Sequence, residues 1–217
     1  MRHGRPGRER REHLAVCPTT LGPMNSTGAD RLRFGYTDED DAMTTSTAPR
    51  EAKNLDGYGN PPLEWERVMA ALDRTRDLPV SDSASHYWIS TTRPDGRPHV
   101  MGVGIFWDDG SFYLVSGPRT QKSRNLAHDP RCTVSVAAPG LDIVAEGKAR
   151  ILRDDAELQR IATLFGDWGP QARDGAFWHE YSAPSAGPPP WDVYEISPTT
   201  IYAVATAEPN GATRWRL

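Results

Sequence analysis

The segment at residues 116–126, SGPRTQKSRNL, has the residue types and spacing of an anion-binding site. Small residues end a strand-like run there, and Thr120 is placed to cap a helix that starts inside a basic cluster. Backbone N–H groups at a helix start, a pair of hydroxyl groups and Lys122 would converge on one negative charge, and a phosphate fits that description. A capped surface helix with solvated Arg and Lys side chains fits the same spacing, so both interpretations stay open at this point.

Motifs of other chemistries are missing from the sequence. It has no GxxxxGKS or GxxxxGKT segment, and Gly102 and Gly104 lack the third glycine and the following helix of a dinucleotide fingerprint. No GxSxG nucleophile elbow is present. The six histidines show no HxxxH or CxxC partner spacing, so we expect no metal site, and we interpret His99 and His128 as surface or packing residues.

The elements that must position residues 116–126 follow two hydrophobic periods. Residues 63–74 predict a helix, because one face with helical spacing carries Trp65, Val68, Met69 and Leu72. A meander of strands separated by turns is predicted at residues 87–91, 99–107 and 111–116. A second helix is expected at residues 120–129, since Thr120 caps it and Pro130 ends it.

The second half of the sequence adds strands, one helix and a long loop. Strands are expected at residues 132–136, 143–151, 191–205 and 213–217. Asp154 and Glu157 form a capping-box pattern in front of a helical apolar stripe. The loop at residues 166–190 is rich in Gly, Pro and aromatic residues, with a helical turn expected near residues 177–181. The order of elements predicts an α+β fold whose antiparallel sheet closes as a barrel, with peripheral helices.

Residues 1–60 show neither the helical period of 3.6 residues nor the strand period of two. They begin with an Arg-rich stretch and contain an acidic cluster at residues 38–41, so we interpret them as a disordered N-terminal tail. A basic arm that touches nucleic acid is the alternative for this tail, and Met24 or Met43 is an alternative start of the chain. Residues 61–217 then form one domain.

Composition argues against several classes of partner. The 217 residues include 25 Lys and Arg against 29 Asp and Glu, and this net charge of −4 disfavours a protein that coats nucleic acid or an anionic membrane. No run approaches the ~18 apolar residues of a membrane span, and no apolar block follows the basic start as in a signal peptide. We therefore expect a soluble, cytoplasmic protein with no nucleic-acid or membrane partner.

Several motifs resemble the pyridoxamine 5′-phosphate oxidase-like superfamily, the FMN-binding split β-barrels. They are a TxxxDGxP turn at residues 91–98, a GxFYLVSG strand at residues 110–117 and a KxRNLxxDPR helix at residues 122–131. With the closing GATRWRL, they are most similar to the actinobacterial branch that includes enzymes using the deazaflavin coenzyme F-420. The resemblance covers about residues 63–217. The Ser-Arg-Lys phosphate trio of the oxidases stands here as Thr120-Gln121-Lys122, which puts oxidation of pyridoxamine phosphate itself in doubt.

This resemblance implies a flavin- or deazaflavin-dependent oxidoreductase that transfers hydride to or from a small organic substrate. The cofactor, coenzyme F-420 or FMN, would lie at the interface of a homodimer. By resemblance, its phosphate would be bound by Ser116, Gly117, Thr120, Gln121 and Lys122, with support from Arg124 and Asn125. Its ring would face the backbone near Met101 and Val103, and Arg214 and Trp215 would reach it from the chain end or serve only in packing. A non-catalytic cofactor- or haem-binding barrel is the alternative function.

The loop at residues 166–190 is predicted to line the substrate side of the ring. It carries four large rings, on Trp168, Phe177, Trp178 and Tyr181, and these need a flat surface to cover. The alternative is that they close the open end of the barrel as ordinary packing.

Overall fold

The computed structural model describes residues 48–76, 86–165, 169–180, 182 and 185–217. All of them belong to one unit, Thr45–Leu217. The predicted tail up to residue 47, both alternative chain starts, Trp168 and Tyr181 lie outside the described residues.

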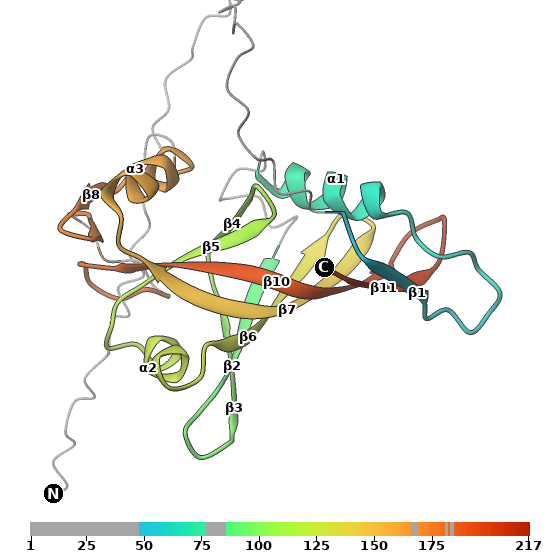
Figure 1. The fold of residues 1–217 in the computed structure, drawn as a ribbon, viewed down its shortest axis with the longest axis horizontal. Coiled ribbons are helices and arrows are strands. Elements are labelled where there is room, and N and C mark those ends of the chain that lie inside the picture. Colours follow the sequence, from blue (N-terminus) through green and yellow to red (C-terminus); the bar gives the residue numbers. More distant parts are fainter. Residues whose placement is uncertain (1–47, 77–85, 166–168, 181, 183–184) are drawn as a thin grey trace, which may run out of the picture. The chain divides into compact units, whose positions relative to one another are not determined.

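A nine-stranded antiparallel sheet forms the body of this unit (Figure 1). Seven of its strands lie in the order β1-β11-β10-β7-β6-β2-β3, and β5 pairs with both β10 and β4. The strands are β1 (Glu51–Asn54), β2 (His86–Thr92), β3 (Pro98–Gly102), β4 (Ile105–Asp108), β5 (Ser111–Ser116), β6 (Arg131–Ala138), β7 (Leu141–Leu152), β10 (Asp192–Ala205) and β11 (Ala212–Arg216). The predicted α+β fold with an antiparallel split barrel is confirmed.

Three helices cover the sheet in the described part of the chain: α1 (Trp65–Arg76), α2 (Gln121–His128) and α3 (Asp155–Thr163). In Figure 1, α1 and α3 lie on one side of the long strands β7 and β10, and α2 lies on the other. All three helices match sequence predictions. Thr120 caps α2, and Asp154 caps α3 by accepting from the N–H groups of Ala156 and Glu157. None of these helices is long and apolar enough to cross a membrane.

Two apolar clusters form the core. The first packs α1, through Val68 and Leu72, into the same cluster as the strand residues Ile89, Val134 and Ile143. The second joins Leu158 and Ile161 of α3 to Phe177, Trp191 and Val193. Both clusters include residues of the long strands β7 and β10. These two strands pair with β6 and β5, the strands that α2 connects.

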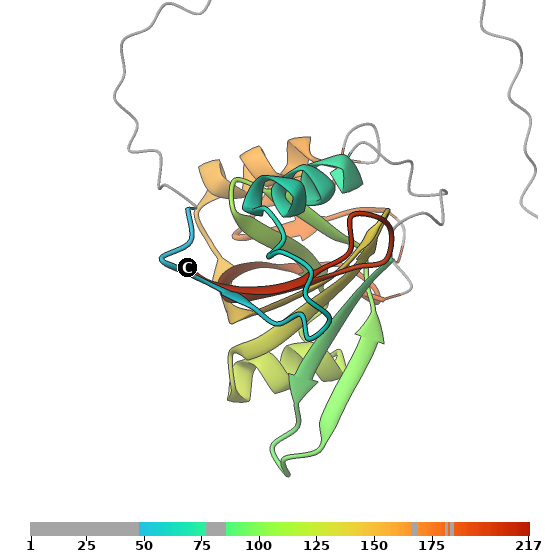
Figure 2. The ribbon, with the colours of Figure 1, turned by 90° about the vertical axis from the view of Figure 1, so that its right-hand side faces the viewer.

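The run predicted as one strand at residues 99–107 is divided in the structure. It leaves β2 after Gly102 and joins β5 from Ile105 onward, so Val103 and Gly104 form the break. Figure 2 shows the β2–β3 hairpin extending past α2, away from the rest of the sheet. The physical reason for the break is that the two halves of the run pair with different strands of the split barrel.

Two further predictions differ from the structure. Residues 51–54, assigned to the tail, form β1, which pairs antiparallel with β11 over Glu51–Arg216 to Asn54–Thr213. Their side chains are all exposed, so no apolar period marked this edge strand. The helical turn expected near residues 177–181 is instead part of a hairpin of β8 (Gln171–Arg173) and β9 (Ala176–Trp178). Its turn residues Asp174 and Gly175 have φ of 56° and 69°, the positive angles typical of an Asp-Gly hairpin turn.

Candidate functional site

Three hydroxyl groups tie the end of β5 to the first turn of α2. The Oγ of Ser116 lies 2.8 Å from the Oγ1 of Thr120, which in turn donates to the Oγ of Ser123 at 3.0 Å. Ser123 closes the triangle by donating to Ser116 at 2.9 Å, and its backbone N–H donates to the Thr120 hydroxyl. The small, hydroxylated residues that the sequence places here therefore fix the start of the helix, where N–H groups lack helical partners.

Lys122 lies in the second position of this helix and is almost completely buried, with 2% of its surface exposed. Its Nζ donates a hydrogen bond to the backbone carbonyl of Ser185. Burial lowers the pKa of the Lys122 ammonium to about 8, because the charged form loses its hydration.

The same stretch of chain covers Gly117. The N–H of Gly117 donates to the carbonyl of Ala186 at 2.8 Å. A Cβ at position 117 would lie 2.7 Å from that carbonyl oxygen, so only glycine permits this approach. We call residues 185–190 the strap. The strap thus occupies two donors, the Gly117 amide and the Lys122 ammonium, that the sequence assigned to a phosphate.

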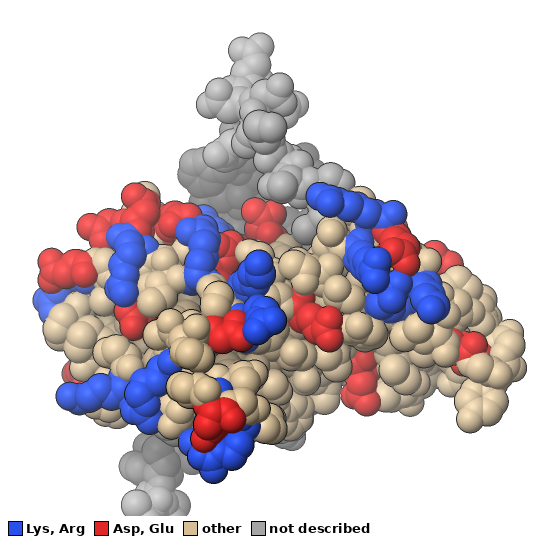
Figure 3. Space-filling view, turned by 60° about the horizontal axis from the view of Figure 1, so that its bottom comes forward, with Lys and Arg blue, Asp and Glu red and all other residues tan. Residues whose placement is uncertain are grey.

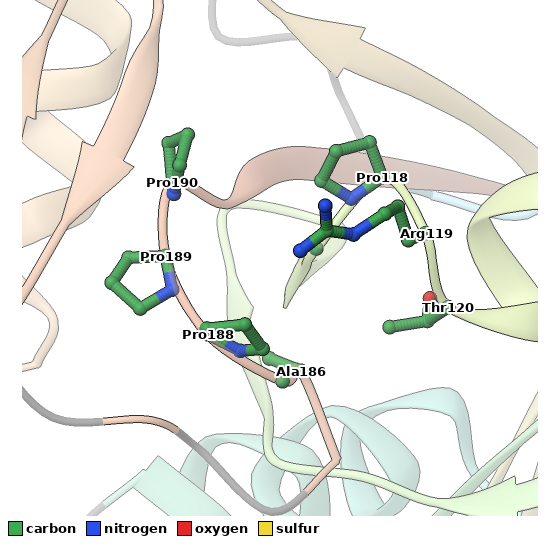
Figure 4. A pocket seen from close by; sticks show the side chains of 9 residues that line it. Pro118, Arg119, Thr120, Ala186, Pro188, Pro189 and Pro190 are labelled. Carbon is green, nitrogen blue, oxygen red and sulfur yellow. The ribbon is translucent and has the colours of Figure 1, made fainter.

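A pocket of about 310 Å³ opens between the strap and the start of α2. It is lined by residues 117–120 on one side and residues 186–190 on the other. Figure 4 shows the Arg119 side chain reaching across this space from beside Pro118 toward the proline wall of the strap. The pocket therefore combines a guanidinium group, the start of a helix and an apolar wall.

Cations surround this region. His99 of β3 has a lowered pKa, caused by burial and by the nearby positive charges of Arg93 and Lys122. Each of these charges disfavours a second cation, so together they favour an anion. The space-filling view from the α2 side shows Lys and Arg in separate groups with acidic side chains between them (Figure 3). On this face of the described residues, the positive charge is therefore divided into small groups.

Gln121, predicted to bind the phosphate, is joined by hydrogen bonds along α2 to the two predicted supporting residues, Arg124 and Asn125. The Arg124 guanidinium donates to Gln121 Oε1 at 2.9 Å, and Gln121 Nε2 donates to Asn125 Oδ1 at 2.7 Å. Asn125, which is completely buried, donates through Nδ2 to the hydroxyl of Thr91 on β2 at 2.9 Å. These side chains anchor the helix to the sheet. They thereby position residues 116–122, the predicted phosphate-binding segment, which we call the cradle.

The predicted ring-facing residues lie at the β3–β4 break. Met101 is 44% exposed on β3, and Val103 donates its backbone N–H to the carbonyl of Tyr87. A Cβ added at Gly104 would meet open space. The break therefore leaves room beside the backbone for a flat group.

The two residues predicted from the chain end are not brought to α2, because β11 lies at a different part of the sheet (Figure 1). Trp215 is 2% exposed and packs against Trp65, with ring centroids 5.5 Å apart. Arg214 pairs with Glu51 at 2.6 Å. Within this chain, Trp215 therefore serves packing and Arg214 forms an ion pair.

Two of the predicted substrate-lining rings are described. Phe177 is completely buried in the second apolar cluster, near Phe165, so in this chain it serves packing. Trp178 is half-buried, and the Arg173 guanidinium lies 4.5 Å from the centroid of its ring. It borders a second pocket, of about 400 Å³, together with residues of the β8–β9 hairpin. Trp178 remains the candidate for a lining residue.

Sequence reasoning missed the strap. The signal for the strap is the run Gly187-Pro188-Pro189-Pro190, which cannot form a helix or a central strand and was absorbed into the long loop. Only the fold shows that this run returns to the start of α2.

Comparison with known protein families identifies the family of this chain. A family model described as pyridoxamine 5′-phosphate oxidase matches residues 82–205, more than half of the chain. The chain belongs to the pyridoxamine 5′-phosphate oxidase family. The matched residues include β3, all of α2 and the strap, so the cradle lies inside the part of the chain that defines the family. No curated protein matches the sequence significantly.

Solved structures with similar folds include proteins of varied description. General Stress Protein 26 from Bacillus anthracis is 19% identical, with a TM-score of 0.45, over 70% of this chain and 97% of its own. A pyridoxamine 5′-phosphate oxidase-related, FMN-binding protein from Nostoc punctiforme is 17% identical, with a TM-score of 0.47, over 70% and 87%. An F-420 reductase is 21% identical, with a TM-score of 0.38, over 57% and 98%.

Proposed function

We propose that this member of the family is a flavin- or deazaflavin-dependent oxidoreductase that binds the phosphate of its cofactor at the start of α2. The observation that carries the proposal is the burial of Lys122, a lysine with a pKa lowered to about 8, at a capped helix start. Burying an ammonium group is costly, and an anion placed against it would offset that cost.

The residues fit a phosphate in kind. The helix supplies N–H groups and Lys122 supplies a positive charge, while the Thr120 and Ser123 hydroxyls, which donate within the triangle with Ser116, hold the start of the helix in place. The open backbone at Gly104 fits a flat ring. When bound, a flavin or deazaflavin supplies hydride transfer, so no side chain of the protein has to act as a nucleophile. The chain's own work is to hold the phosphate, orient the ring and exclude water from it.

Arg119 favours the deazaflavin over FMN. Coenzyme F-420 carries an acidic tail beyond its phosphate, as the resemblance implies, and this tail needs further cations. Arg119 lines the pocket next to the cradle, whereas Arg124 is engaged with Gln121 and with the carbonyl of Arg119. One accessible guanidinium therefore supports the choice, and titration with each cofactor tests it.

We also propose a homodimer. β3 is an edge strand of the sheet, and it exposes Val100 and Met101 at 56% and 44%. Apolar side chains on an exposed edge are a liability that a partner strand or face removes. A second copy placed there would cover the β2–β3 hairpin and the backbone on which the ring is proposed to lie.

The experiment that tests the proposed function is a titration followed by turnover. Purified protein is mixed with FMN or coenzyme F-420, and absorption and fluorescence report binding. Reduced cofactor is then supplied with hydride acceptors. Cofactor binding without consumption of any acceptor supports the alternative, a non-catalytic carrier of a cofactor or haem. If neither cofactor binds, the proposal is overturned.

A further inference from the structure

We infer that the strap, residues 185–190, closes the phosphate site in the free protein and has to move before Lys122 can bind an anion. This inference rests on the proposed function, because it concerns the same cradle. It explains why the lysine assigned to the phosphate is only 2% exposed.

The strap carbonyls accept hydrogen bonds from two donors that the proposed function assigns to an anion. Ser185 O accepts from the Lys122 ammonium, and Ala186 O accepts from the Gly117 amide. These two donors lie on different elements, one on α2 and one just after β5, and consecutive carbonyls satisfy both. A phosphate has several oxygens that accept hydrogen bonds, so the strap and a phosphate would compete for the same donors.

The competition favours the anion. A carbonyl offers the Lys122 ammonium only a dipole, whereas a phosphate offers a full negative charge, so the Coulomb attraction is stronger with the phosphate. The lowered pKa of Lys122 agrees with this, since a well-compensated ammonium keeps its ordinary pKa. The closed strap is therefore a weaker partner than the ligand it excludes.

One hydrogen bond reports the position of the strap. The Nε1 of Trp191 donates to the carbonyl of Gly187 at 2.9 Å. Trp191 is completely buried and is held to Phe177 by two backbone hydrogen bonds, so its indole is a fixed reference. Gly187 has a φ of 76°, and a Cβ there would meet no neighbour, so this point of the strap is free of side-chain packing. Movement at Gly187 breaks or lengthens the indole hydrogen bond.

The test is a titration of the full chain, first with inorganic phosphate and then with FMN. The NMR resonance of the Trp191 indole N–H is monitored throughout. The Trp191→Phe variant assigns the resonance. We expect the resonance to shift in proportion to the fraction bound, and to stay in place with Lys122→Met, which lacks the ammonium group. Phosphate or FMN binding that leaves the wild-type resonance unchanged overturns the strap and leaves the proposed function standing.

Affinity provides a second measurement. Trp191→Phe removes one of the three described hydrogen bonds that hold the strap closed, so this variant should bind FMN about fivefold more tightly, the factor that one ordinary hydrogen bond contributes. Unchanged or weaker binding by a folded Trp191→Phe variant contradicts the inference. Absence of binding of phosphate, FMN and coenzyme F-420 in both the wild type and Trp191→Phe overturns the proposed function, and the strap inference with it.

Discussion

The ammonium group of Lys122 donates to the backbone carbonyl of Ser185, a residue 63 positions further along the chain. This contact joins the most chemically informative motif of the sequence to a Pro-rich segment with no motif of its own. It also places a cation in the interior with a neutral partner. Under the proposed function, this one side chain links the stability of the protein to its affinity for the cofactor phosphate.

Replacing Lys122 by Met should stabilise the protein at pH 7. The pKa of Lys122 is about 8 in the folded chain and 10.5 for an ordinary lysine, so the folded state binds fewer protons between these values. The wild type thus carries the full cost of the buried charge below pH 8 and loses that cost as the pH rises toward 10.5. We expect Lys122→Met to gain roughly 1–4 kcal/mol at pH 7 in denaturant unfolding, a gain that shrinks as the pH rises.

The matched control is Lys148→Met, because Lys148 is exposed. It should show no such pH-dependent gain. A Lys122→Met variant that is less stable than the wild type at pH 7 would show that the ammonium is a structural anchor and not a poorly compensated charge.

Phosphate and FMN binding should weaken as the pH rises above about 8. The free protein loses the Lys122 proton there, whereas a bound anion raises the pKa of the ammonium, so the dissociation constant should increase by up to tenfold per pH unit. His99 of β3 has a lowered pKa and Tyr194 of β10 a raised one, so both are neutral in this range. Isothermal titration between pH 7 and 9.5 measures the slope.

Lys122→Arg is the control for this slope, because a guanidinium keeps its charge throughout the range. It should bind with an affinity independent of pH above 8. If the wild type and Lys122→Arg show equal slopes, another group controls the pH dependence.

Phe177 and Trp178 are neighbours in sequence with different expected roles. Phe177→Ala should lower the unfolding free energy by about 3–5 kcal/mol, because it empties a completely buried position. Trp178→Ala should leave the melting temperature and the cofactor affinity nearly unchanged and raise the Michaelis constant of the substrate found by the turnover screen. A large loss of stability in Trp178→Ala, with intact kinetics in the folded fraction, would assign this ring to packing as well.

A charge at Met101 should separate the proposed dimer. Met101→Asp places a carboxylate on the exposed edge strand, where burial against a second copy would cost several kcal/mol. Sedimentation should then report a monomer with weakened FMN binding. Tyr58→Asp is the control, since Tyr58 is 96% exposed in the loop between β1 and α1 and should change neither property. A wild-type monomer that binds FMN at full affinity would reject the dimer.

The helices, most strands and the residue types at the start of α2 could be read from the sequence alone. Periodicity located the apolar stripe of α1, and Thr120 and Asp154 marked helix starts because a cap depends only on residues two or three positions away. The family followed from local motifs as well, since its turn, strand and helix signatures are each contiguous. Each of these features depends only on residues that lie close together in the sequence.

The tertiary structure decided what lies against those elements. β1 has four exposed side chains, so its place beside β11 depends on backbone pairing across more than 150 residues and leaves no apolar pattern. Trp215 and Phe177 are large rings that suit a site or a core equally, and only burial assigned them to the core. The strap is the same case, because the partner of Lys122 is a backbone carbonyl, and every residue carries one.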